Sequence, residues 1–208
     1  MMKISKIEKS KHRQERVLVY TEEGDLLRVT GAELLRFNLY SGMDLSDELV
    51  VELQKAARQS ENRQRAARIA SSRMLSRQEM QERLTKKGAS EEEAAELTDW
   101  LTELGAVDDA VYAGTVARHY AAMGYGAEKV RQELHRRGIP RELWEAALAE
   151  LPPAEESIEQ YIRSKWRGDF FDRAAVKKLS DALLRRGFAW KEIRPVLNRL
   201  GEEIEEDE

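Results

Sequence analysis

One short motif occurs three times along the chain, and its spacing constrains the fold more than any other feature. Each copy contains a leucine, two basic residues, a glycine and then a small or apolar residue. The copies are LTKKGA at 84–89, LHRRGI at 134–139 and LLRRGF at 183–188, so the glycines lie 50 and then 49 residues apart. A constant period of this length indicates tandem structural repeats, which stack on their neighbours.

The motif predicts how one helix of each repeat ends. A glycine just beyond a helix adopts the left-handed backbone conformation without a Cβ penalty, and the apolar residue after it contacts the leucine one turn earlier. The basic pair then lies in the last turn, where cations interact favourably with the helix dipole. The proposed structural caps are Leu84, Gly88, Leu134, Gly138, Leu183 and Gly187.

Apolar residues at helical spacing precede and follow each motif, so each repeat is expected to contain three helices. The fold class is therefore mainly α, with tandem three-helix repeats in an elongated curved array. The predicted domains are an N-terminal β-hairpin plus helices at 1–60, three-helix repeats at 61–108, 109–153 and 154–200, and an acidic tail at 201–208.

The N-terminal segment differs from the repeats. Val17 and Val19 precede the sequence TEEGD, and Leu27 and Val29 follow it, so a β-hairpin with its turn at 23–25 is expected. This is the only strand signal in the chain. Either Asp44 or Ser46 is expected to cap the next helix, which carries Leu49, Val50 and Leu53.

Several classes of function have no support in the sequence. The chain has no cysteine, which removes disulfides and thiolate chemistry. His12, His119 and His135 are too scattered for a zinc site, and no glycine-rich phosphate loop precedes a Gly-Lys-Ser/Thr sequence. Asp108 and Asp109 are interpreted as a helix N-cap rather than metal ligands. We therefore expect a protein that is not an enzyme and binds no cofactor or metal. Without an apolar leader or membrane span, we expect it in the cytoplasm.

Charge is segregated along the chain. The net charge is −4, but the last eight residues contribute six acids, and residues 160–199 hold eleven Lys or Arg against four acids. Such a basic segment suggests an anionic partner. The candidate partner-binding residues are Arg163, Lys165, Arg167, Arg173, Lys177, Lys178, Arg185, Arg186, Arg131, Arg136 and Arg137. For Arg185 and Arg186, capping of their own helix is the favoured explanation.

The strings SRQEMQERLTKKG, LTELGAVDDAVYA and MGYGAEKVRQELHRRGI occur in this order and resemble the RecX family of recombination regulators. The resemblance spans roughly Ile4 to Leu200, with Ala89 and the pair Ala106-Val107 as departures. It implies a monomer that binds RecA filaments on single-stranded DNA, contacting the DNA directly or through the filament. It also implies inhibition or modulation of recombinase, ATPase and co-protease activities in DNA repair, homologous recombination and the SOS response.

Two other functions remain open on the residues alone. One is a helical protein that binds nucleic acid without sequence specificity, although aromatic residues are sparse among the basic ones. The other is a helical-repeat scaffold for an unrelated protein. Binding to bare and to RecA-coated single-stranded DNA separates the three hypotheses.

Overall fold

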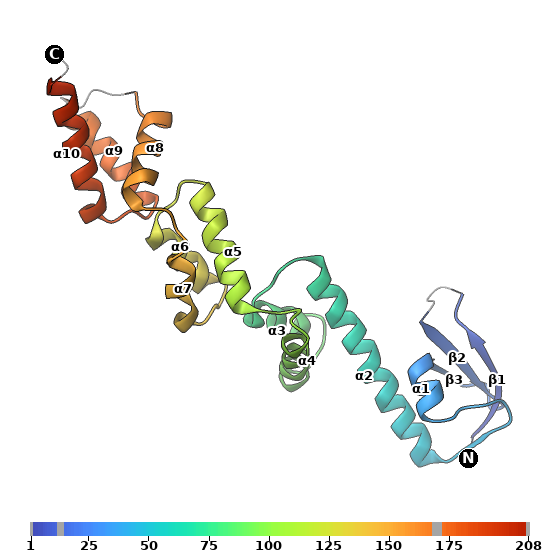
Figure 1. Ribbon diagram of the computed structural model, residues 1–208. Coiled ribbons are helices and arrows are strands. Elements are labelled where there is room, and N and C mark those ends of the chain that lie inside the picture. The colour runs from blue at the N-terminus through green and yellow to red at the C-terminus, as the bar shows by residue number, and fades with distance from the viewer. Residues whose placement is uncertain (1, 12–14, 168–171, 207–208) are drawn as a thin grey trace. The chain divides into compact units, whose positions relative to one another are not determined.

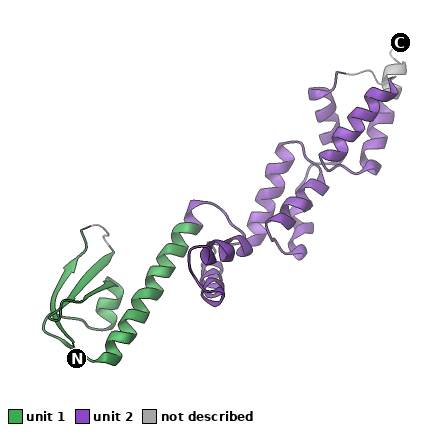
Figure 2. Ribbon diagram, turned by 180° about the vertical axis from the view of Figure 1, so that it is seen from behind, with its two compact units in different colours: residues 1–69 green, residues 70–208 purple. Residues whose placement is uncertain are grey.

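The protein contains two compact units, residues 1–69 and residues 70–208 (Figure 2). The structure, a computed structural model, describes residues 2–11, 15–167 and 172–206, and for 201–206 it describes the backbone alone. Helices dominate the described chain, and a small antiparallel sheet lies near the N-terminus (Figure 1). The mainly α class is therefore confirmed.

The first unit contains a four-stranded antiparallel sheet with the strand order β3-β2-β1-β4. The predicted hairpin is confirmed, since Val17 pairs with Val29 and Val19 with Leu27 across β2 and β3. The sheet is larger than the predicted hairpin, because two further strands that gave no sequence signal extend it. The strands are β1 (Met2–Lys9), β2 (Arg16–Thr21), β3 (Leu26–Thr30) and β4 (Asp44–Leu45).

Two helices complete the first unit. Helix α1 (Gly31–Arg36) begins with a capping box formed by Thr30 and Glu33. Helix α2 (Asp47–Ser72) begins after Ser46, whose hydroxyl accepts a hydrogen bond from the Leu49 N–H at 3.2 Å. Of the two predicted caps, Ser46 therefore serves this helix, and Asp44 lies in β4.

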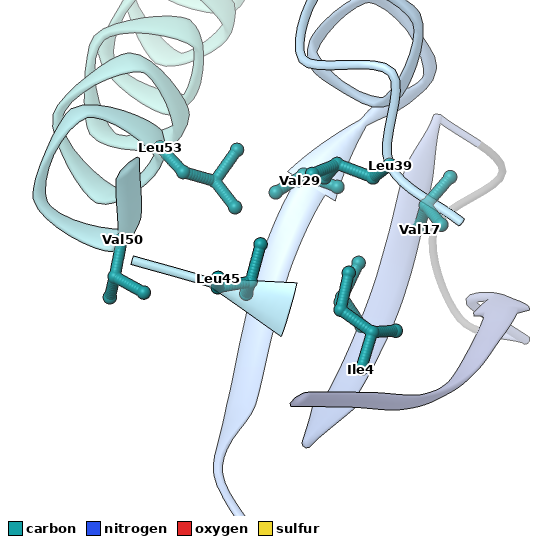
Figure 3. Close-up of a cluster of buried hydrophobic side chains, with 8 residues drawn as sticks. Ile4, Val17, Val29, Leu39, Leu45, Val50 and Leu53 are labelled. Carbon is teal, nitrogen blue, oxygen red and sulfur yellow. The ribbon is translucent and has the colours of Figure 1, made fainter. Parts of the chain in front are cut away.

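The core of the first unit joins the sheet to α2. Ile4 of β1 and Val29 of β3 are buried together with Leu45 of β4 and with Val50 and Leu53 of α2. Figure 3 shows the Leu53 side chain directed toward Val29. Strand β1 contributes one fully buried side chain, which explains why its lysine-rich sequence gave no strand signal.

The second unit contains helices in successive groups. Helix α3 packs on α4, α5 packs on α6 and α7, and α10 packs on α8 and α9. The helices are α3 (Arg77–Thr85), α4 (Glu91–Glu103), α5 (Asp109–Ala122), α6 (Ala127–Arg136), the short 3-10 helix η1 (Arg141–Leu143), α7 (Trp144–Leu148), α8 (Ala154–Lys165), α9 (Arg173–Arg185) and α10 (Trp190–Glu206). We call α3, α6 and α9 the middle helices of the three repeats.

The second and third repeats each have a separate core. Leu134 of α6 is buried among residues of α5 and α7, and Leu183 of α9 is buried among residues of α8 and α10. Helix α10 continues through most of the segment 201–208 that was predicted as an acidic tail, and residues 207–208 lie outside the described chain.

The middle helices end with the same pattern of hydrogen bonds. The residue after each glycine donates its N–H to the carbonyl oxygen of the motif leucine, from Ala89 to Leu84 at 3.2 Å, from Ile139 to Leu134 at 3.1 Å and from Phe188 to Leu183 at 3.2 Å. The three glycines have φ values of +93°, +66° and +87°. Left-handed glycines in this pattern form Schellman caps.

Candidate partner-binding surface

Helix α9 presents the densest group of exposed cations among the predicted partner-binding residues. Arg173, Lys177, Lys178 and Arg185 are exposed, whereas Leu179 on the same helix is buried in the third repeat. Their helical spacing places the four cations on the half of α9 that faces away from the core. We call these four residues the α9 cation face.

No internal ion pair involves the α9 cation face in the part of the chain that the structure describes. Within the described residues, its four side chains pair with no carboxylate, and the same holds for the exposed Lys165 at the end of α8. These cations therefore need not break an internal contact to meet an anionic partner.

Other predicted residues are partly engaged with their own helices. Arg163 lies 3.4 Å from Glu159, and Arg131 lies 3.2 Å from Glu128. Arg167 donates hydrogen bonds to the carbonyl oxygens of Trp166 and Arg163 at the end of α8. Exposed pairs of this kind contribute little to stability, about 0–1 kcal/mol, so these arginines remain accessible to a partner.

Arg136 pairs with the buried carboxylate of Glu133 on the second middle helix. Its guanidinium donates hydrogen bonds to Glu133 at 2.6 and 2.9 Å. Burial opposes ionisation of Glu133, but hydrogen bonds from Arg136, Tyr120 and Lys129 outweigh it and lower the pKa of this carboxyl. The hydrogen bond with Glu133 raises the pKa of Arg136. Arg136 is thus already neutralised locally, unlike Arg185 at the equivalent position.

The second residue of the two arginine pairs, Arg137 or Arg186, joins adjacent repeats. Arg137 accepts a hydrogen bond from the Ser76 hydroxyl through its carbonyl oxygen, and Ser76 is the N-cap of the preceding middle helix, α3. The Arg137 guanidinium lies 5.3 Å from the centre of the Tyr112 ring, donates to the Tyr112 hydroxyl and lies 3.7 Å from Glu79 of α3. Arg137 therefore contacts both the first and the second repeat.

A second contact at this junction is buried. The Asp109 carboxylate, 7% exposed, accepts a hydrogen bond from the backbone N–H of Arg77 at 2.9 Å. Burial raises the pKa of Asp109, against the opposing effect of Arg77. Its neighbour Asp108 is the N-cap of α5 and accepts from the N–H groups of Ala110 and Val111, as the sequence predicts.

Arg186 forms the equivalent junction between the second and third repeats. Its carbonyl oxygen accepts from the N–H of Gly126, the N-cap of α6, at 2.9 Å. Its guanidinium donates to the carbonyl oxygens of Met123 and Gly124 at 2.9 and 3.0 Å and stacks on the rings of Tyr125 and Tyr161. Arg186 is the C-cap residue of its own helix, α9, and its guanidinium in addition reaches the end of α5.

Close backbone approach at this junction requires glycine on both sides. A Cβ on Gly126 would lie 2.5 Å from the carbonyl oxygen of Gly187, and one on Gly187 would lie 2.3 Å from the backbone nitrogen of Lys129. The Gly187 carbonyl also accepts from the Glu128 N–H at 3.0 Å. By contrast, a Cβ on Gly88 would meet nothing within 4 Å. The motif glycine of the third repeat thus serves the junction as well as the helix end.

The aromatic partners of these arginines were not predicted, although the sequence contains a signal for them. Tyr112 lies 26 residues before Gly138, and Tyr161 lies 26 residues before Gly187. Ser76 and Gly126, the two N-cap residues, each lie 12 residues before the motif glycine of their own repeat. Alignment of the three repeats by their glycines would have placed these residues in matching positions.

The described residues offer no alternative site of metal or membrane type. In the part of the chain that the structure describes, no group of three or more His, Cys, Asp or Glu side chains is arranged to hold a metal ion. No described helix is long and apolar enough to cross a bilayer.

Together these features define a tandem-repeat helical protein whose successive bundles are joined end to end and whose last bundle carries a free cationic helix face. The sequence matches the first three-helix domain of RecX over residues 63–105 and the second over residues 108–148. It is 31% identical to the regulatory protein RecX of Geobacillus kaustophilus, over 92% of this chain and 74% of that protein. The chain belongs to the RecX family of regulatory proteins.

Two further comparisons agree with this assignment. The regulatory protein RecX of Mycolicibacterium smegmatis is 34% identical over 58% of this chain and 69% of its own length. A crystal structure of a regulatory protein RecX is similar in fold, with a TM-score of 0.76 at 22% identity, covering 95% of this chain and all of that one.

Proposed function

We propose that this protein binds RecA filaments on single-stranded DNA and restrains their recombinase, ATPase and co-protease activities without performing a reaction itself. Membership of the RecX family is the observation that carries the proposal. The protein would act as a monomer in the cytoplasm and contribute to the control of DNA repair, homologous recombination and the SOS response.

The α9 cation face is the part of the chain that best suits an anionic filament. Its four side chains are exposed and free of ion pairs within the described residues. They would meet DNA phosphates or an acidic RecA surface, with Lys165 and Arg167 beside them in the sequence. Contacts to phosphate release counterions, so affinity for the filament would fall steeply with salt.

Restraint of the filament needs no catalytic group. A ligand shifts an equilibrium toward the state that it binds more tightly. If successive repeats contact neighbouring RecA subunits, binding would favour one arrangement of those subunits and oppose the changes that ATP turnover requires. The junctions at Arg137 and Arg186 support this mechanism, because they would hold adjacent contact surfaces at a defined spacing.

The test is an equilibrium titration of a fluorescently labelled single-stranded oligonucleotide, bare or coated with RecA and a slowly hydrolysed ATP analogue. We expect tighter binding to the coated strand and, in a parallel assay with ATP, a fall in RecA ATPase rate over the same concentration range. Equal affinity for both strands would support a general nucleic-acid-binding protein instead. Binding to neither would support a scaffold for an unrelated partner.

A further inference from the structure

Strand β3 forms a free edge of the sheet in the first unit, because β2 is its one neighbour in the strand order. The N–H of Thr21 donates to the carbonyl oxygen of Asp25 at 3.0 Å, so these two residues form a hydrogen-bonded pair. Two and four residues further along the strands, Val19 pairs with Leu27 and Val17 pairs with Val29. Hydrogen-bonded pairs alternate along an antiparallel ladder. The N–H and C=O groups of the intervening β3 residues therefore point away from β2.

Those outward groups belong to Leu26 and Arg28. Within the described residues, no backbone or side-chain group hydrogen-bonds to the main chain of either one outside the strand ladder. Both residues are exposed. An edge that leaves two donors and two acceptors unpaired is a template for an added strand.

A groove of about 720 Å³ runs along this edge, within the first unit. Four consecutive residues of β3, 26–29, line one wall together with Arg16 and Leu18 of the neighbouring strand β2. Leu53, Ala57 and Glu61 of α2 lie at helical spacing along the opposite wall. The groove therefore has the form that an extended segment would fill.

The charged lining of the groove is predominantly positive. The Arg16 guanidinium forms an ion pair with the Glu61 carboxylate at 2.7 Å. Arg28 on β3 and Arg58 on α2 are exposed and, in the part of the chain that the structure describes, pair with no carboxylate. Two cations on opposite walls thus remain available to a ligand.

We propose that this groove binds an extended acidic segment of a partner protein, which adds as a fifth strand beside β3. The main chain of the segment would hydrogen-bond to Leu26 and Arg28. Acidic side chains of the segment would meet Arg28 on one wall and Arg58 on the other, and apolar ones would pack against Ala57. This inference concerns the first unit and does not depend on the RecA proposal.

The probe is a fluorescein-labelled ten-residue peptide in which glutamate and valine alternate, titrated with the full-length protein and followed by fluorescence anisotropy. We expect Arg58→Glu to weaken binding about tenfold, the effect of losing one favourable charge contact and gaining a repulsive one. Lys55→Glu is the matched control, because it changes the same charge on an exposed residue of α2 that does not line the groove. Equal weakening by both substitutions would overturn the proposal.

A second variant tests the strand addition itself. Leu26→Pro removes one outward N–H but no ladder hydrogen bond, because the Leu26 N–H points away from β2. We expect the variant to keep its circular dichroism spectrum and thermal midpoint while peptide affinity falls at least about fivefold, the loss of a single main-chain hydrogen bond. Unchanged affinity in a folded variant would overturn strand addition. Displacement of the peptide by a single-stranded oligonucleotide at lower concentration than by unlabelled peptide would also overturn it, in favour of nucleic acid.

Discussion

The backbone N–H of Gly126 donates a hydrogen bond to the carbonyl oxygen of Arg186 at 2.9 Å. This bond joins the N-terminus of α6 to the C-terminal end of α9. The first N–H groups and last carbonyl groups of a helix lack hydrogen-bond partners within that helix. Here an N–H at the start of α6 and a carbonyl oxygen at the end of α9 are each other's partner. The positive end of one helix dipole also meets the negative end of the next, which is favourable. One repeat earlier, the Ser76 hydroxyl joins the corresponding helix ends by donating to the carbonyl oxygen of Arg137.

Gly126→Ala tests the closest approach at this junction. The added Cβ would lie 2.5 Å from the carbonyl oxygen of Gly187, so the third repeat must shift. We expect the free energy of unfolding in urea to fall by about 1–3 kcal/mol, the usual cost of overpacking. Gly31→Ala is the control, because its Cβ would meet nothing within 4 Å. A Gly126→Ala variant as stable as this control would contradict the junction.

A comparison of Gly187→Ala with Gly88→Ala separates two contributions of the motif glycine to stability, its role in the helix C-cap and its role in the junction between repeats. Both glycines have positive φ, so both substitutions carry the left-handed penalty of about 1–2 kcal/mol. Gly187→Ala should cost more, because its Cβ would also meet the backbone of Lys129 at 2.3 Å, whereas Gly88 faces open space. The measurement is chemical unfolding of the two variants side by side. Equal losses would mean that the third repeat is not locked to the second at this glycine.

The two arginines of the third motif should separate stability from binding. Arg186→Ala removes hydrogen bonds to Met123 and Gly124, and we expect a loss of about 1.5–3 kcal/mol in unfolding free energy. Arg185→Ala, on the exposed α9 cation face, should change unfolding by less than about 0.5 kcal/mol but weaken binding to RecA-coated DNA. The check is urea unfolding and filament titration on both proteins. The reverse assignment of effects would refute the division of roles.

Asp109 should give the junction between the first and second repeats a pH dependence. Burial raises the pKa of Asp109 in the folded protein above its ordinary value of 3.8, so the folded state binds this proton more tightly than the unfolded state. Ionisation of Asp109 therefore costs stability as pH rises, and this cost disappears as pH falls through the folded pKa. Asp109→Asn keeps an oxygen acceptor for the Arg77 N–H without the charge. The stability of the wild type relative to this variant should increase between about pH 7 and about pH 4. A difference in unfolding free energy between the two proteins that does not change with pH would contradict the predicted role of Asp109.

The helix ends of the repeats could be predicted because their signals are local. A leucine and a glycine four residues apart, such as Leu134 and Gly138, suffice to place a Schellman cap. The junctions could not be read from one motif, because Ser76 and Arg137 lie 61 residues apart and meet only after each repeat has folded. Strand β1 was not predicted for another reason. It hydrogen-bonds to a strand on each side, but only Ile4 among its side chains is fully buried, so its sequence lacks the alternating apolar pattern of a strand. The contacts of the Arg186 guanidinium could not be predicted for the same reason, because its partners, Met123 and Gly124, belong to a different repeat.

The most direct test of the account is the dissociation constant for RecA-coated single-stranded DNA, measured at several salt concentrations, of a protein carrying Arg173→Glu, Lys177→Glu and Lys178→Glu. A control carries Lys55→Glu, Lys86→Glu and Lys87→Glu, the same change in net charge at other exposed positions. We predict that the α9 variant binds at least about tenfold more weakly than the control, with a shallower salt dependence, since each lost phosphate contact removes about 0.9 from the slope. Equal dissociation constants and equal salt slopes for the two variants would contradict the claim that α9 is the surface that binds the filament.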